Sequence, residues 1–197
     1  MKYSLATSSW DHLEYEAIQK VIDSNMFSMG KEVQYYESSF AKYFGSKYAI
    51  MTSSGSTANL LMIASLFFSK EFKINRGDEV IVPAVSWSTT YFPLQQYGLH
   101  VKFVDIDLNT LNYDIEELKK AVSDKTRIVL AVNLLGNSNN FNQIKNIIKG
   151  KNIILLEDNC ESMGAKFDGK HTGTFGLMGT FSSFFSHHIS TMEGGMI

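Results

Sequence analysis

The sequence predicts an α/β fold in which a mostly parallel sheet is covered by helices on both faces. Two observations predict it. Short, continuous apolar runs recur along the chain, as in strands that are buried on both faces, and amphipathic helical patterns lie between them. The length of 197 residues, 44% of them hydrophobic, suits one domain with a large core or two small domains.

Six apolar runs mark the expected strands. They span residues 48–51, 79–82, 101–106, 128–132, 153–156 and 180–185, and Pro83 stops the second of them. The chain then stops at Glu193-Gly194-Gly195-Met196-Ile197, soon after the last strand and a turn. We therefore expect an incomplete piece of a longer protein.

Helical periodicity fills the intervals between the strands. Asp11 opens the first pattern, Gly30 breaks it, and a second pattern ends at Gly45. Further helices are expected over residues 58–68, 115–122 and 141–148. We divide the chain into an N-terminal helical segment, residues 1–30, and a large domain, residues 31–197.

Composition excludes several classes of protein. A net charge of −2 and a pI of about 6.2 argue against a strongly basic nucleic-acid binder. The single cysteine, Cys160, excludes an internal disulfide and a cysteine-built zinc site, and we expect no metal centre. Because the chain has no run of 18 apolar residues and no apolar signal core, we expect no membrane span and a cytoplasmic location.

The informative loops are those that follow strands, because ligands of parallel sheets collect at the carboxyl ends of the strands. Ser54-Gly55-Ser56-Thr57 joins a strand to a helix, where glycine permits close approach and free N–H groups attract an anion. An ordinary helix N-cap explains the same residues. No Walker lysine follows, which disfavours a nucleoside triphosphate loop.

Three further features follow strands. The acids in Glu157-Asp158-Asn159 need a cation or good hydrogen bonds, so they either meet a ligand such as a pyridinium nitrogen or are satisfied within the fold. Trp87 either stacks on a flat ligand or belongs to the core. Ser182 lies in the last strand, and His187-His188 follow on an extended segment, where neighbours point opposite ways; the alternative is two partly buried histidines with hydrogen bonds.

The ordered set Ser54-Gly55-Ser56-Thr57, Glu157-Asp158, Phe181-Ser182 and Glu193-Gly194-Gly195 resembles the sugar aminotransferase family known as the DegT/DnrJ/EryC1/StrS group. The resemblance runs from about Leu13 to the end of the chain and covers the first half of a family member. It implies the large domain of a fold-type I enzyme that uses pyridoxal 5′-phosphate, with a seven-stranded-type sheet and without the small C-terminal domain. It also implies a homodimer with the site at the interface.

The resemblance carries the following roles onto this sequence. The phosphate of the cofactor would be held by Gly55, Ser56, Thr57 and Ser182. Asp158 would pair with the pyridinium nitrogen, and Trp87 would stack on the ring. Glu161 takes the place of a family glutamine near the ring hydroxyl.

His187 departs from the family pattern. Counted back from Glu193-Gly194-Gly195, it takes the position of the lysine that bonds the cofactor, and no lysine occurs after Lys170. The run from Ser186 to Gly195 is similar to the family's 3-dehydratases, which remove the C3 hydroxyl of a GDP-linked 4-keto-6-deoxy sugar. This implies that L-glutamate converts the cofactor to pyridoxamine 5′-phosphate and that His187 is the general base. It also implies a place in deoxysugar (colitose) synthesis for the lipopolysaccharide O-antigen.

Other interpretations remain open from the sequence. A 3-dehydratase for a CDP-linked sugar needs an iron–sulfur partner, and Cys160 alone cannot hold such a cluster. A plain aminotransferase is disfavoured by the missing lysine. The hypothesis outside the enzymes is that the chain is a non-catalytic truncated fragment.

Overall fold

The computed structural model describes residues 7–197. The chain forms two compact units, one up to Met51 and one over Thr52–Ile197, and each is described separately. The sequence-based boundary between residues 30 and 31 stays a prediction. Among the described residues, no helix has the length and apolar character needed to span a bilayer, and no three His, Cys, Asp or Glu side chains are grouped to hold a metal ion.

The first unit contains helices α1 (His12–Asp23) and α2 (Lys31–Phe44), as the periodicity predicts. Asp11 begins α1 through a capping box, in which its side chain accepts from Leu13 and its N–H donates to Glu14. Gly45 ends α2 in the left-handed conformation that glycine adopts without strain. Both predicted helices are confirmed.

The expected buried strand over residues 48–51 is wrong in extent and burial. Strand β1 is only Met51–Thr52, and the side chains of Tyr48 and Ile50 are exposed. An apolar run gives no information on pairing, and a strand exists only where a neighbour accepts its backbone hydrogen bonds.

The second unit is built on a mostly parallel sheet, to which β1 also belongs, in the order β1-β9-β8-β5-β4-β2-β3. The pairs β2–β3, β2–β4, β4–β5 and β5–β8 are parallel, and β8–β9 is antiparallel. The predicted fold class is confirmed. The strands are β2 (Glu79–Pro83), β3 (His100–Val104), β4 (Thr126–Val132), β5 (Ile154–Asp158), β8 (Met178–Ser182) and β9 (Gly195–Met196).

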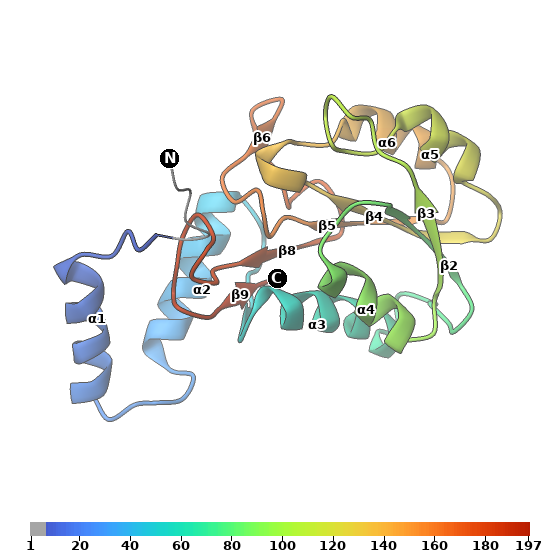
Figure 1. Ribbon diagram of the computed structural model, residues 1–197. Coiled ribbons are helices and arrows are strands. Elements are labelled where there is room, and N and C mark those ends of the chain that lie inside the picture. Colours follow the sequence, from blue (N-terminus) through green and yellow to red (C-terminus); the bar gives the residue numbers. More distant parts are fainter. Residues whose placement is uncertain (1–6) are drawn as a thin grey trace. The chain divides into compact units, whose positions relative to one another are not determined.

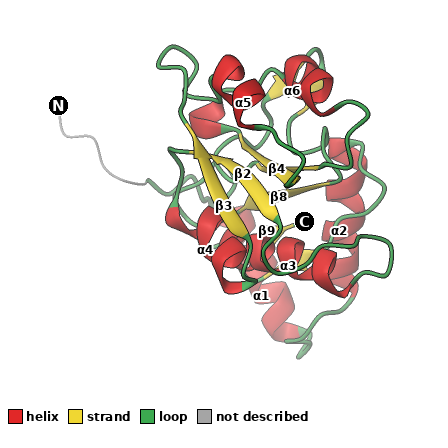
Figure 2. Ribbon diagram, turned by 90° about the vertical axis from the view of Figure 1, so that its right-hand side faces the viewer, coloured by secondary structure: helices red, strands yellow, loops and turns green. Residues whose placement is uncertain are grey.

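Helices cover both faces of this sheet (Figures 1 and 2). Helices α3 (Gly55–Phe68) and α4 (Ser88–Gln96) lie below the sheet in Figure 1, and α5 (Ile115–Ala121) and α6 (Phe141–Ile148) lie above it. The sequence did not predict α4, because Pro93 lies inside it and its apolar face is weak. The short helix η1 (Leu134–Gly136) and the hairpin of β6 (Lys166–Phe167) and β7 (Lys170–His171) were also not predicted.

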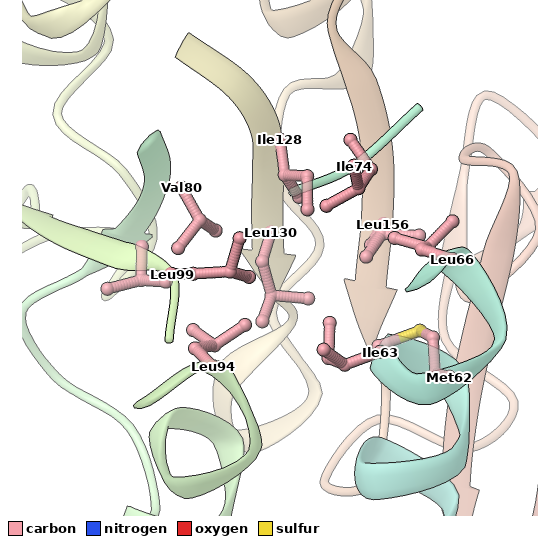
Figure 3. Packing of buried hydrophobic residues seen from close by; sticks show 11 residues of the cluster. Met62, Ile63, Leu66, Ile74, Val80, Leu94, Leu99, Ile128, Leu130 and Leu156 are labelled. Carbon is pink, nitrogen blue, oxygen red and sulfur yellow. The ribbon is translucent and has the colours of Figure 1, made fainter. Parts of the chain in front are cut away.

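Alternation along the strands gives each face its own core. Val80, Leu130 and Leu156 point to one face and pack with Met62 and Ile63 of α3 (Figure 3). The opposite face carries a second cluster, to which Ile81, Val129 and Leu155 contribute from the strands and Leu118, Phe141 and Ile144 from α5 and α6. The central strands are therefore fixed from both sides, and their carboxyl ends form a stable edge.

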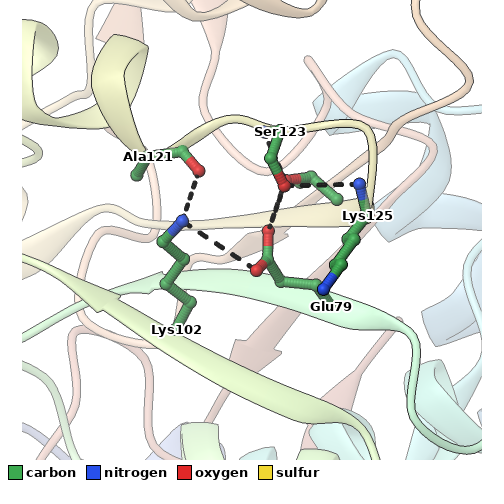
Figure 4. Close-up of polar contacts among 6 residues, drawn as sticks. Glu79, Lys102, Ala121, Ser123 and Lys125 are labelled. Atoms are coloured by element: carbon green, nitrogen blue, oxygen red, sulfur yellow. Dashed lines mark hydrogen bonds and ion pairs between the residues drawn. The ribbon is translucent and has the colours of Figure 1, made fainter.

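A polar cluster joins the amino-terminal ends of β2, β3 and β4 (Figure 4). Glu79 is 7% exposed and accepts hydrogen bonds from the hydroxyls of Thr126, over 2.6 Å, and Ser123, over 3.2 Å. Lys102 Nζ lies 3.9 Å from the same carboxylate and donates to the carbonyl of Ala121 over 2.7 Å. This buried acid thus has a cation within its own chain.

Candidate active site

The start of α3 lies directly after β1 and is tightly capped. Ser54 is the N-cap: its hydroxyl accepts from Thr57 N over 3.1 Å, and Thr57 Oγ1 accepts from Ser54 N over 2.9 Å. The alternative interpretation of this loop as a helix N-cap is therefore confirmed for Ser54. It does not exclude an anion, because the first N–H groups of a helix have no partner within the helix.

Gly55 allows α3 to approach the end of β8 and the loop after β5. A Cβ atom at Gly55 would lie 2.7 Å from Ser182 Cβ and 2.9 Å from Cys160 Sγ, so no other residue fits without displacement. The contact places the hydroxyl of Ser182, the last residue of β8, beside the helix start. Ser56 is exposed, whereas Ser182 is buried. The structure thus brings Gly55 and Ser182 together, as the sequence analysis expects.

Asp158 is the last residue of β5 and is 4% exposed. Its Oδ2 atom accepts from Asn59 Nδ2 and from Thr90 Oγ1, each over 2.8 Å, and its Oδ1 atom accepts from Cys160 N over 3.1 Å. These donors are neutral, and among the described residues no ion pair reaches Asp158. A buried carboxylate with neutral donors alone is suited to a cationic ligand.

Glu157, the preceding residue, points to the other face and is satisfied within the fold. Its carboxylate accepts from the backbone N–H groups of Gly173, over 2.6 Å, Gly176, over 2.7 Å, and Phe175. Burial raises the pKa of Glu157, and these hydrogen bonds oppose that shift. The sequence leaves open whether this motif is structural or ligand-binding, and these hydrogen bonds make Glu157 a structural acid.

Trp87 precedes the first turn of α4 and is 70% exposed. The alternative that it is a core tryptophan is therefore wrong. Its carbonyl accepts from Thr90 N over 3.0 Å, and the Thr90 side chain donates to Asp158. The exposed ring thus stands three residues before a donor to the buried acid.

The segment after β8 differs from the expected extended strand. β8 ends at Ser182, and His187 lies in a bend, with its N–H donating to Phe184 O over 2.9 Å. The argument that His187 and His188 point opposite ways on a strand is therefore wrong. The His187 ring lies edge-on to Phe184, with centroids 6.3 Å apart, and His188 is exposed.

Burial lowers the pKa of His187, and the negative charges of Glu161 and Asp158 partly oppose this shift. Glu161 comes from the loop after β5, where its Oε2 atom accepts from Leu135 N over 3.2 Å. Leu135 has a φ of 51°, a left-handed conformation that costs energy for this residue type. The carboxyl edge of the sheet thus brings an imidazole into the electrostatic range of two acids.

Asn59 and Thr90 are the site residues that the sequence analysis missed. They come from α3 and α4 and lie 99 and 68 positions from Asp158 in the sequence. One signal was available: Asn59 is the only amide in the otherwise largely apolar run of α3, and a buried helical face rarely tolerates an amide without a partner.

Fold and geometry together give an α/β protein with a candidate ligand site at the carboxyl ends of parallel strands, where a helix start, a buried acid and a histidine lie. The chain belongs to the DegT/DnrJ/EryC1/StrS aminotransferase family, whose sequence profile matches residues 9–197. The family resemblance inferred from the sequence is confirmed.

Two kinds of relative are most informative. GDP-4-keto-6-deoxy-D-mannose 3-dehydratase of Escherichia coli O55:H7 is 71% identical over all 197 residues, which make up 51% of that protein. The solved structure of the E. coli enzyme with bound hydrated pyridoxal phosphate and a second structure of a GDP-4-keto-6-deoxymannose-3-dehydratase, with glutamate trapped on pyridoxal phosphate, each superpose with a TM-score of 0.97 at 71% identity. Each superposition includes 99% of this chain and 50% of the chain in the solved structure. The chain thus spans about half the length of the relatives it matches.

Proposed function

We propose that the protein is a pyridoxal phosphate-dependent 3-dehydratase that removes the C3 hydroxyl of GDP-4-keto-6-deoxy-D-mannose. L-Glutamate converts the cofactor to its pyridoxamine form, and the product leads to GDP-colitose for the O-antigen. The observation that carries the proposal is Asp158, a buried acid without a cation in the described chain. The 71% identity to a dehydratase of this specificity over the whole chain supports the choice of substrate.

The residues present fit pyridoxal 5′-phosphate. The close contact of Gly55 with Ser182 brings the Ser182 hydroxyl beside the N–H groups of the helix start, and such a set of donors suits an approaching phosphate. We assign the phosphate to Gly55, Ser56, Thr57 and Ser182, the ring nitrogen to Asp158, the ring face to Trp87 and the ring hydroxyl to Glu161. Thr57 Oγ1 already bonds Ser54, so its hydroxyl contacts phosphate only by exchanging a capping bond.

When bound, the cofactor supplies a protonated ring that acts as an electron sink. Asp158 holds the proton at the ring nitrogen by offering a negative charge and no competing proton. His187 is kept in its neutral form near pH 7 because burial lowers its pKa, so a ring nitrogen of the imidazole is free to accept a proton. Residues 171–197 contain no lysine, so this segment has no primary amine to bond the cofactor.

We further propose that the working protein is a cytoplasmic homodimer whose sites lie at the subunit interface. Support for the homodimer comes from the family resemblance. The homodimer is proposed for the full-length protein. Its molecular mass in solution, measured with and without cofactor, tests this proposal.

The function is tested with the purified protein, pyridoxal phosphate, L-glutamate and GDP-4-keto-6-deoxy-D-mannose. We expect glutamate to shift the cofactor absorbance to that of the pyridoxamine form, followed by loss of the C3 hydroxyl and release of ammonia. A GDP-linked 4-amino sugar as the product would instead show a transaminase. Turnover of a CDP-linked sugar in preference would replace the proposed substrate.

A further inference from the structure

Two helices from different parts of the chain converge on a single oxygen of Asp158. Asn59 Nδ2 of α3 and Thr90 Oγ1 of α4 each lie 2.8 Å from Oδ2. Both donors are buried, with 3% and 1% of the residue exposed. A side-chain amide and a hydroxyl removed from water on this scale need partners, and here the partner is the same atom.

Each of the two donors is itself held by a third residue. Thr180 Oγ1 of β8 donates to Asn59 Oδ1 over 2.7 Å, which fixes the orientation of the amide and leaves Nδ2 to face Asp158. Thr90 Oγ1 lies 2.8 Å from Ser86 Oγ. An ionised carboxylate only accepts, so the Thr90 proton goes to Asp158, and Ser86 must donate to Thr90.

This arrangement divides the two oxygens of the carboxylate. Among the described residues, Oδ2 accepts from two side chains, whereas Oδ1 accepts from the N–H of Cys160, at 3.1 Å. The Cys160 thiol also interacts with this carboxylate. A carboxylate oxygen accepts about two hydrogen bonds, so Oδ1 retains an acceptor position. Three donors from three segments also fix the plane of the carboxylate, and with it the direction of that position.

We propose that Asn59 and Thr90 are positioning residues that turn Asp158 so that its Oδ1 atom faces the ring nitrogen of bound pyridoxal phosphate. The inference rests on the proposed function and adds to it the residues that orient the acid. A purely structural acid in this protein looks different: Glu157 is satisfied by backbone N–H groups, and Glu79 lies beside Lys102. Asp158, like Glu79, has two side-chain donors on one oxygen, but among the described residues no ion pair reaches it.

The test compares two ligands, pyridoxal 5′-phosphate and its 1-deaza analogue, in which the ring nitrogen is replaced by C–H. The dissociation constant of the analogue is divided by that of pyridoxal 5′-phosphate, both measured by fluorescence quenching. This ratio reports the contact at the ring nitrogen, because losses at the phosphate affect both ligands equally. We expect Thr90→Val and Asn59→Leu each to lower this ratio about tenfold, since each removes one hydrogen bond to a charged group. Thr90→Ser keeps the hydroxyl and should stay within about twofold of the parent.

A matched control comes from the other end of the sheet. Thr126→Val removes a buried hydroxyl that donates to Glu79 over 2.6 Å, and should lower the thermal midpoint without changing the ratio. An unchanged ratio in a folded Thr90→Val protein would overturn the positioning role, while tight binding of pyridoxal phosphate by the parent would still support the proposed function. A parent that does not discriminate between the two ligands would overturn the assignment of Asp158 itself.

Discussion

Glu79 and Asp158 are both buried acids of the central sheet, and they lie at its opposite ends. Glu79 is the first residue of β2 and Asp158 the last residue of β5. Each accepts a short hydrogen bond from a buried threonine, Thr126 or Thr90. They differ in their charged neighbours: Lys102 lies 3.9 Å from Glu79, whereas the donors to Asp158 are all neutral.

The difference separates an acid that stabilises the fold from one that awaits a ligand. A buried charge is costly unless it is paired, and the Glu79 cluster meets this cost within the chain while joining β2, β3 and β4. At Asp158 the cost is only partly met by hydrogen bonds, and a bound cation completes it. The same residue class thus serves stability at one edge and binding at the other.

The largest effect is expected from Asp158→Asn. The amide oxygen still accepts from Asn59 and Thr90, so the fold is retained, but an N–H group replaces the free acceptor. Loss of a hydrogen bond between charged groups costs up to about 3 kcal/mol, or roughly 100-fold in cofactor affinity. Turnover should nearly vanish because the ring nitrogen is no longer kept protonated. Equilibrium titration with pyridoxal phosphate and a product assay check both, and near-normal activity would remove the assignment.

The next effect is on proton transfer at His187. His187→Asn should bind the cofactor as the parent does and lose elimination by about 10²–10⁴-fold. His188→Asn, in the exposed neighbour, is the matched control and should change the proton-transfer rate far less. Because burial lowers the pKa of His187 from 6.5, the acidic limb of the pH–rate profile should lie below pH 6.5. Above that limb the base is neutral and active, and protonation removes activity as the pH falls through it.

The same position gives a covalent test. The parent should form no borohydride-stable bond to pyridoxal phosphate in its active site, because residues 171–197 contain no lysine and His187 takes the position of the family's bonding lysine. His187→Lys should form one and shift the reaction towards transamination. Mass spectrometry of tryptic peptides after reduction identifies the bonded residue, and an adduct on an active-site lysine of the parent would contradict the dehydratase proposal.

A smaller effect, on stability alone, is expected at the other end of the sheet. Glu79→Gln removes the charge beside Lys102 and should lower the free energy of unfolding by about 1–2 kcal/mol, measured by urea denaturation. Cofactor affinity should stay within about twofold, since the cluster lies at the amino ends of the strands. A matching loss of cofactor affinity would show that the two ends of the sheet are coupled and would break the comparison.

The fold was largely predictable because parallel strands buried on both faces are continuous apolar runs. Two of the differences from the prediction have physical causes. Pro93 inside α4 removes the usual helical signal from its sequence, and the exposed residues Tyr48 and Ile50 form no strand pairing. The site was predictable where a reactive side chain comes at the end of an apolar strand, as Asp158 does. Its donors Asn59 and Thr90 were not, because they lie 99 and 68 positions away and only the tertiary fold brings them together.

The two serines assigned to the cofactor phosphate should differ in their contribution to binding. Ser182 is 5% exposed and lies against Gly55, whereas Ser56 is exposed at the start of α3. A hydroxyl bond to a charged phosphate contributes about 1.5–3 kcal/mol, and burial moves this value upward while exposure to water moves it downward. Ser182→Ala should therefore weaken cofactor binding by tenfold or somewhat more, and Ser56→Ala by about tenfold or less, with little change in the chemical step. Single-turnover rates at saturating cofactor separate binding from chemistry. If both variants bind pyridoxal phosphate as tightly as the parent, the phosphate lies elsewhere than at the start of α3, and only the acid at the end of β5 remains of the assigned site.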